Sequence, residues 1–373
     1  MMCIMNLIFI KDVFKDIYKH RGELTDSKRR NELIKRWWRI YVMPPPETNV
    51  YIDLERQPEI FRKSGFTLTA DQPKQVALTN DRKTALVSCM SSRKLQFFEA
   101  ESLQKTGEID MEEQCVEVIT RGDLAFATTT NFVEQPPFHN KLWVVDIPNQ
   151  RIVSGVKTEG NWSKVIAITP DGLQALVSNW QSNSISVINI ANPEKPTVTQ
   201  VVPLRKCPRG IAFTSDGGKA IVANFYSGNI AELAKVADRW KVIYESEMFD
   251  QPRYPGNPRH VLISPNNHFA YISNKGRNLI HVWSIPERRF VTSYSVGKGP
   301  NTIDYFGHVS DQLIVSCSHS DRVCLLDLKT GKVLGVSPKT GENTTGMCAL
   351  SETEFLATGF NSNSLEKFTL TNR

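Results

Sequence analysis

The chain has 373 residues, of which 40% are hydrophobic and 23% are charged, and its formal net charge is +6. These values are ordinary for a folded protein, and they exclude a disordered or collagen-like chain. The seven cysteines are odd in number and show no metal-ligand spacing, which predicts free thiols in a reducing, cytoplasmic setting, with no metal and no other cofactor.

The first 48 residues predict a basic, helical N-terminal extension. Residues 1–10 are apolar, but they are too short to span a membrane, which takes about 20 residues, and no basic leader precedes them. A signal anchor remains the lesser alternative. A second helix is expected between a cap at Asp26 and the three prolines that begin at Pro44. Its notable side chains are basic or aromatic: Arg29, Arg30, Arg36, Trp37 and Trp38.

Three interpretations of this basic helix remain open. Its tryptophans would pack on the rest of the protein while its arginines stay in solvent, or the helix would dock a protein partner or a second copy. The third interpretation is contact with an anionic membrane or with nucleic acid.

From about residue 70, one pattern recurs seven times along the chain. A short apolar strand leads through a tight turn to a second strand that ends in a small residue, and a polar loop leads to a third strand. The clearest copies are residues 164–188, 208–233 and 255–289. The small residues that end the second strands are Ser88, Thr128, Ser178, Ala223, Ser273, Ser316 and Thr358.

The spacing of these units predicts an all-β, seven-bladed β-propeller over residues 49–373. A unit of about 45 residues matches one four-stranded blade, and the strand-like alternation of side chains is unlike a helical repeat. The last unit ends at Arg373 without an outer strand. A segment within residues 49–70, either 50–52 or 65–69, is therefore expected to pair with the last blade and close the ring.

The repeat resembles two families of propellers. Asp-Gly turns followed by Val-Ser-Asn at 177–179 or Val-Ala-Asn at 222–224 resemble the YVTN-repeat seven-bladed propellers. Gly-Asn-Pro-Arg-His at 256–260 is similar to one blade of the seven-bladed lactonase propellers. The resemblance covers about residues 70–373, and the Gly-His and Trp-Asp signatures of WD40 repeats are absent.

The lactonase resemblance implies a functional arginine at Arg259 and a glutamate directly after Asn274. The chain has Lys275 at that position. A lysine reverses the charge of the expected general base, so the resemblance predicts no catalytic residue here. A lactonase-like hydrolase stays the alternative.

In propellers, the segment leading into each innermost strand borders the central channel. Here these segments carry polar and mostly cationic residues: Lys74, Lys164, Arg209, Arg259, His260 and Asn301. Converging cations favour an anion or an acidic side chain. In the other interpretation, Arg209 and Arg259 bond carbonyl groups or acids such as Glu117 and Asp304 and hold the blades in register.

The sequence therefore favours a non-catalytic binding or scaffold module that holds a protein partner or an acidic ligand at the cationic mouth of its channel. The alternatives are the lactonase-like hydrolase and a propeller that uses its basic helix on DNA or a membrane.

Overall fold

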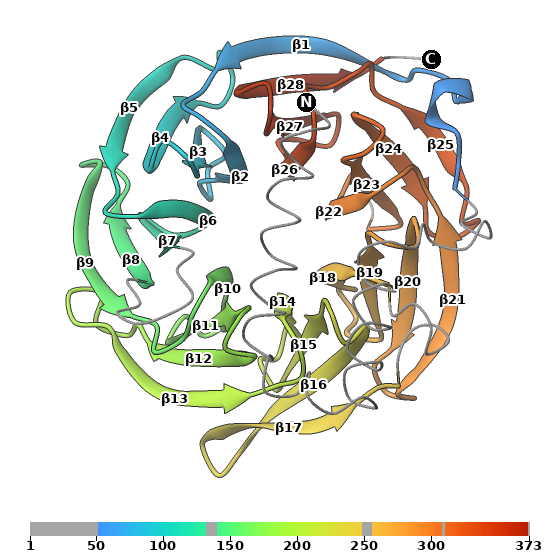
Figure 1. Ribbon diagram of the computed structural model, residues 1–373. Coiled ribbons are helices and arrows are strands. Elements are labelled where there is room, and N and C mark those ends of the chain that lie inside the picture. Colours follow the sequence, from blue (N-terminus) through green and yellow to red (C-terminus); the bar gives the residue numbers. More distant parts are fainter. Residues whose placement is uncertain (1–50, 132–139, 248–255, 308–309, 372–373) are drawn as a thin grey trace, which may run out of the picture. The chain divides into compact units, whose positions relative to one another are not determined.

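The computed structural model describes residues 51–131, 140–247, 256–307 and 310–371. These residues form seven four-stranded antiparallel sheets and one short 3-10 helix, Leu54–Arg56. The sheets surround a common axis as the blades of a propeller (Figure 1). The predicted all-β, seven-bladed architecture is confirmed. The helices expected in residues 1–48 lie outside the described residues.

Each of the first six blades is built from four consecutive strands, innermost first. Blade 1 contains β2 (Pro73–Leu78), β3 (Thr84–Cys89), β4 (Lys94–Glu99) and β5 (Lys105–Asp110). Blade 2 contains β6 (Gln114–Arg121), β7 (Leu124–Thr130), β8 (Lys141–Asp146) and β9 (Arg151–Lys157). Blade 3 contains β10 (Ser163–Ile168), β11 (Gln174–Asn179), β12 (Ser184–Asn189) and β13 (Thr197–Pro203).

The remaining blades follow the same order. Blade 4 contains β14 (Pro208–Phe213), β15 (Lys219–Asn224), β16 (Asn229–Val236) and β17 (Arg239–Glu245). Blade 5 contains β18 (Pro258–Ile263), β19 (Phe269–Asn274), β20 (Leu279–Ser284) and β21 (Arg289–Ser295). Blade 6 contains β22 (Pro300–Tyr305), β23 (Gln312–Cys317), β24 (Arg322–Asp327) and β25 (Val333–Val336). Blade 7 contains β26 (Thr344–Ala349), β27 (Glu354–Gly359), β28 (Ser364–Leu370) and β1 (Phe61–Leu68).

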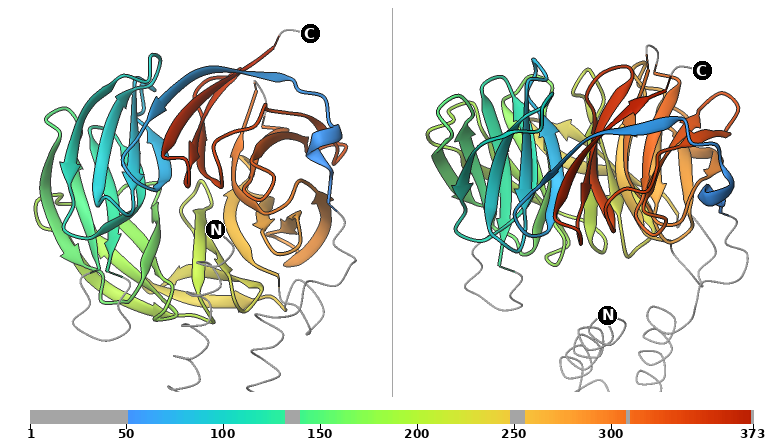
Figure 2. Two further views of the ribbon diagram at one scale, coloured as in Figure 1. Left: turned by 45° about the horizontal axis from the view of Figure 1, so that its top comes forward. Right: turned by 90° about the horizontal axis from the view of Figure 1, so that it is seen from above.

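The ring is closed by β1, which pairs antiparallel with β28 as the outer strand of blade 7. The register runs from Phe61 opposite Leu370 to Leu68 opposite Ser364. Of the two candidate segments, 65–69 is the one that contributes to this strand. Figure 2 shows β1 in blue beside the red strands of blade 7. The first described strand and the last one thus share a sheet, so closure joins segments about 300 residues apart.

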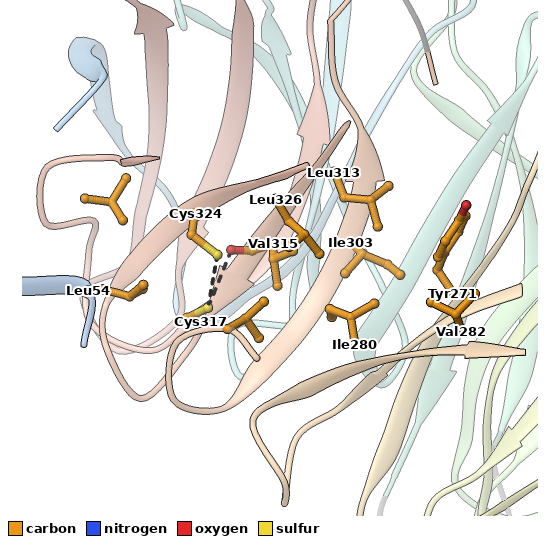
Figure 3. Packing of buried hydrophobic residues seen from close by; sticks show 12 residues of the cluster. Leu54, Tyr271, Ile280, Val282, Ile303, Leu313, Val315, Cys317, Cys324 and Leu326 are labelled. Carbon is orange, nitrogen blue, oxygen red and sulfur yellow. Dashed lines mark hydrogen bonds between the residues drawn. The ribbon is translucent and has the colours of Figure 1, made fainter. Parts of the chain in front are cut away.

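The hydrophobic core is divided among the interfaces between blades. The described residues contain seven buried clusters, and each one joins two neighbouring blades. Figure 3 shows the cluster in which Ile280 and Val282 of blade 5 meet Leu313 and Val315 of blade 6. Because a blade buries both of its faces only against two neighbours, the second strands are almost fully buried, as in β11.

A repeated turn joins the first two strands of several blades. In blade 4, the Thr214 hydroxyl donates to Asp216 Oδ1 (2.5 Å) and accepts the backbone N–H of Lys219 (3.0 Å). Gly217 in this turn has φ +67°, a backbone conformation that glycine adopts without steric cost. The same arrangement recurs at Thr169 and at Ser264, so the Asp-Gly turns predicted from the sequence are structurally equivalent to the turn at Asn266-Asn267.

Every innermost strand is irregular at its beginning. The pairing register shifts in all seven blades at this point, for example between Pro208 and Ile211 in β14 and between Pro258 and Val261 in β18. Such bulges re-aim the side chains that they contain. Neighbouring bulges also lie close together: a Cβ atom on Gly210 would be 2.5 Å from the carbonyl oxygen of Arg259.

Candidate functional site

The four predicted cations all lie within these bulges. Lys74, Lys164, Arg209 and Arg259 come from blades 1, 3, 4 and 5, and each falls inside the shifted part of its strand. Figure 1 places the four strands, β2, β10, β14 and β18, nearest to the axis of the ring. The bulges therefore bring cations together from blades that are distant in the sequence.

The four cations are close enough to influence one another's protonation. Burial, followed by the positive charges of Arg259 and Arg209, holds the pKa of Lys74 well below its usual range. Burial and the same two arginines lower the pKa of Lys164. Burial and Arg209 lower the pKa of Arg259. The charges therefore occupy one shared, poorly solvated space. We call these four residues the channel cations.

One carboxylate, Glu117 of β6, lies among the channel cations. Burial raises the pKa of Glu117, although all four cations oppose that shift. Among the described residues, Glu117 has no ion pair within 4 Å. In the described part of the chain, the site therefore combines four cations with Glu117, which forms no direct ion pair with any of them.

Arg209 is buried without a polar partner, and Arg322 provides the contrast. Arg322 is 7% exposed, and its guanidinium donates to Glu55 (2.9 Å), to Glu59 (2.8 Å) and to the carbonyl oxygen of Ser337 (2.6 Å). Arg209 is 6% exposed, but the described residues offer its guanidinium no hydrogen bond or ion pair. The guanidinium of Arg209 lies over the ring of Phe225, with 5.9 Å between Cζ and the ring centroid.

Aromatic rings accompany the channel cations. The ammonium of Lys164 lies 4.3 Å from the centre of one Trp180 ring, and that of Lys74 lies 5.9 Å from the ring of Phe360. Tyr226 stacks on Trp180, with their centroids 5.5 Å apart. Cation–π contacts of this kind hold a positive charge in place without neutralising it.

The other two predicted residues have different surroundings. His260 accepts the backbone N–H of Ile303 at Nδ1 (3.4 Å), and burial with the nearby arginines lowers its pKa to about 4, so this imidazole is neutral at pH 7. Asn301 is fully buried, and its amide group donates to the carbonyl oxygens of Thr344 (3.4 Å) and Thr345 (3.3 Å). Its Oδ1 has no partner among the described residues.

The alternative structural role for the arginines is wrong in one respect. Asp304 does not pair with Arg209 or Arg259. Its carboxylate accepts the backbone N–H groups of Tyr305 (2.9 Å) and Ala349 (2.9 Å). Asp304 therefore joins β22 to β26 while leaving the arginines without that partner.

Lys275 does belong to the cationic neighbourhood. It follows β19, and burial with the charges of Arg259 and Arg209 lowers its pKa to about 7. The described residues give its ammonium group no carboxylate partner. The lactonase resemblance implies a carboxylate at this position, and the carboxylate that the described residues place near these cations is that of Glu117, from another blade.

Glu117 was named from the sequence as one acid that could meet Arg209 and Arg259, and it does lie among the channel cations. The aromatic rings were not predicted. A signal for the rings exists, because Trp180, Phe225 and Phe360 each directly follow the Asn or Gly that ends a second strand.

The predicted contacts of the N-terminal helix cannot be placed. Arg29, Arg30, Arg36, Trp37 and Trp38 lie outside the described residues. Within the described ranges, no group of His, Cys, Asp and Glu side chains is arranged to hold a metal ion. The same ranges contain no helix of the length and apolar character needed to cross a membrane.

Comparisons with known proteins agree with this fold. The family described as "Lactonase, 7-bladed beta-propeller" matches residues 146–242. These residues include blade 3 and most of blade 4, and therefore Lys164 and Arg209. Antigen Lp49 of Leptospira interrogans is 28% identical over 209 residues, which are 53% of this chain and 45% of that protein. The chain thus matches less than half the length of that relative.

A solved structure shows the same fold. The crystal structure of a functionally unknown protein from Desulfotomaculum acetoxidans superimposes with a TM-score of 0.62 at 18% identity, covering 74% of this chain and 89% of the other. The protein is a seven-bladed β-propeller, and its residues 146–242 are similar to the seven-bladed lactonase family.

Proposed function

We propose that the protein is a binding module that holds an anionic ligand, either a small molecule or an acidic side chain of a partner, among its channel cations. The observation that carries this proposal is the buried guanidinium of Arg209, which lacks a polar partner among the described residues. A buried charge without a counter-charge is costly, and a bound anion would offset that cost.

The charge count supports an anion over a neutral ligand. Among the described residues, Lys74, Lys164, Arg209 and Arg259 share this space with one acid, Glu117. Low-dielectric walls strengthen the attraction between such a cluster and a negative charge. The aromatic contacts and the bulges keep the cations in place before a ligand arrives, which limits the ordering cost of binding.

The test is calorimetric titration of the full chain with inorganic phosphate and with sulfate, using Arg209→Met and a control, Arg62→Met. Arg62 is exposed on β1, so both variants lose one positive charge but only one loses it in the channel. We expect anion affinity to fall at least about tenfold in Arg209→Met, which is 1.4 kcal/mol, and to stay unchanged in Arg62→Met.

The same variants give a second readout in the absence of anions. Removing an uncompensated buried charge is expected to increase the free energy of unfolding in Arg209→Met but not in Arg62→Met. Absence of anion binding by the wild-type protein, or equal affinities in the two variants, would contradict the proposal.

A lactonase-like hydrolase is the second candidate, and two observations favour it. The lactonase family matches residues 146–242, and Glu117 provides a carboxylate beside Arg209 and Arg259. Burial raises the pKa of that carboxyl group, which is a property of general acids and bases that work near neutral pH. Turnover of a lactone panel that disappears in Glu117→Gln would favour this candidate over simple binding.

A further inference from the structure

Lys275 occupies a position that three other blades fill with an aromatic ring and that blades 1 and 6 fill with Met90 and Ser318. The backbone N–H of Lys275 donates to the carbonyl oxygen of Asn257 (2.9 Å). The equivalent bonds run from Trp180 to Trp162 (3.0 Å), from Phe225 to Cys207 (2.9 Å) and from Phe360 to Asn343 (3.3 Å). The shared bond shows that the four residues are equivalent in the repeat.

The aromatic members of this set border the channel cations. Trp180 contacts Lys164, Phe225 contacts Arg209, and Phe360 contacts Lys74, at distances of 4.3 to 5.9 Å. Blade 5 therefore places an amine where blades 3, 4 and 7 place a ring beside a cation. The charges that act on Lys275 are those of Arg259 and Arg209, which is consistent with this placement.

The surroundings of Lys275 favour its neutral form. Burial and the two arginines lower its pKa to about 7, and Glu117 does not act on it as it acts on the four channel cations. Burial and the same two arginines also lower the pKa values of Lys74 and Lys164, but the ammonium groups of those two lysines lie next to aromatic rings. Within the described residues, the amine of Lys275 makes no cation–π contact and no ion pair, and its charge acts on the imidazole of His319, whose pKa burial and Lys275 lower to about 4.

We propose that Lys275 is a reactive amine that forms an imine with a carbonyl compound bearing a carboxylate, such as a 2-oxo acid, whose carboxylate is held by Arg259 and Arg209. This inference rests on the anion site proposed above. A lysine that is desolvated next to other cations is a recognised form of activated nucleophile. The arginines would both bind the carboxylate and keep the amine unprotonated.

The step balances without an oxidant or a reductant. The neutral amine nitrogen of Lys275 attacks the carbonyl carbon and gives a carbinolamine. The C–O bond then breaks, and the carbonyl oxygen leaves as water with the two hydrogens of the amine. The product is a C=N bond between Nζ and the former carbonyl carbon.

The experiment is reductive trapping on the full chain. Wild-type protein is incubated with pyruvate and sodium borohydride, and adducts are located by mass spectrometry of the intact chain and of its peptides. We expect one dominant adduct, on Lys275, whose yield rises with pH and is half-maximal near pH 7. Acetone, which lacks the carboxylate, is expected to label Lys275 at least about tenfold less.

Two variants make the result specific. Lys275→Gln should lose the adduct. Lys298→Gln removes an exposed lysine from the loop between β21 and β22 and should keep the adduct. Adducts spread over exposed lysines, equal labelling by acetone and pyruvate, or an unchanged yield in Lys275→Gln would overturn the proposal.

The calorimetric titration of the wild-type protein with phosphate separates the two proposals. Phosphate binding without an adduct on Lys275 would overturn the imine and leave the anion site standing. Neither phosphate binding nor an adduct would overturn both.

Discussion

Two arginines of this propeller are buried to the same degree but are stabilised differently. Arg322 has two carboxylates and a carbonyl oxygen within hydrogen-bond distance, and it attaches the segment around Glu55 and Glu59 to blade 6. Arg209 contacts the ring of Phe225 and has no such partner among the described residues. An arginine of the first kind holds the fold together, whereas one of the second kind is suited to a ligand.

Residue-level hydrogen bonding also fixes the state of a buried histidine. Asn274 Oδ1 accepts the backbone N–H of Asn257 (3.0 Å), so its amide group faces Nε2 of His281 (3.0 Å). Nε2 must therefore accept, and Nδ1–H donates to the hydroxyl of Ser293 (2.6 Å). Burial and the charge of Arg277 lower the pKa of His281 to about 3.

This histidine predicts a loss of stability in mild acid. Its folded-state pKa is below its unfolded value of about 6.5, so the unfolded chain binds the extra proton first, and stability is lost as the pH falls below 6.5. Between pH 7 and pH 5, His281 should contribute about 2 kcal/mol of the loss. Urea unfolding at both pH values should show a smaller loss in His281→Gln than in the wild type.

The control for this experiment is His268→Gln, which removes an exposed histidine from the same blade. It should lose as much stability between pH 7 and pH 5 as the wild-type protein does. Identical pH dependence in His281→Gln and the wild type would show that the buried imidazole does not resist protonation.

At the scale of the element, the blade hairpin depends on a turn that several blades share. In blade 4, the hydroxyl of Thr214 satisfies both Asp216 and the N–H of Lys219. Thr214→Val preserves the shape of the side chain but leaves these two groups without their partner. Because Thr214 is only 3% exposed, we expect a loss of about 1–3 kcal/mol of unfolding free energy.

The measurement is chemical denaturation of Thr214→Val beside Thr292→Val. Thr292 is exposed on the outer strand β21, so its substitution is expected to change stability by less than about 0.5 kcal/mol. Equal effects of the two substitutions would mean that the turn hydroxyl does not stabilise the hairpin.

These turns explain why the sequence predicts the blades well. Asp171-Gly172 and Asp216-Gly217 mark hairpins by their own conformational preferences, and Gly172 and Gly217 do adopt positive φ. The bulges at Lys74 and Arg259 have no such local signal, because the shift arises from the pairing of two strands. The positions of the cations could therefore be predicted, but not the geometry that turns them toward a common space.

The composition of the site shows the same limit. Cations at the start of repeated strands are visible in the sequence, whereas Glu117 joins them only because the ring brings blade 2 beside blades 1 and 3. Lys275 stands where the lactonase resemblance implies a glutamate, and the sequence offered Glu117 and Asp304 as other acids for the arginines. Only the fold decides between these two acids, because it places Glu117 among the cations and bonds Asp304 to backbone N–H groups.

At the scale of the whole molecule, the ring depends on contacts between distant segments. Phe61 of β1 is 3% exposed, and its ring lies 5.1 Å from that of Phe355 and 5.6 Å from that of Phe306. These partners belong to blades 7 and 6, near the other end of the chain. The closing strand thus contributes hydrophobic contacts as well as backbone pairing.

Phe61→Ala is therefore expected to destabilise the protein by about 3–5 kcal/mol. Phe66→Ala on the same strand is the matched control, because Phe66 is 55% exposed and its loss leaves no buried cavity. Both variants would be compared by urea unfolding. Similar midpoints for the two would show that closure by β1 adds little to stability.

The central claim is that the channel cations bind an anion. It is tested most directly by diffraction from crystals of the full chain soaked in selenate. Anomalous scattering from selenium locates the anion without assumptions about its partners. The account predicts a strong peak within hydrogen-bond distance of Arg209 and Arg259, and its loss in Arg209→Met. Selenate bound only at exposed basic side chains, with no peak between these two arginines, would contradict it.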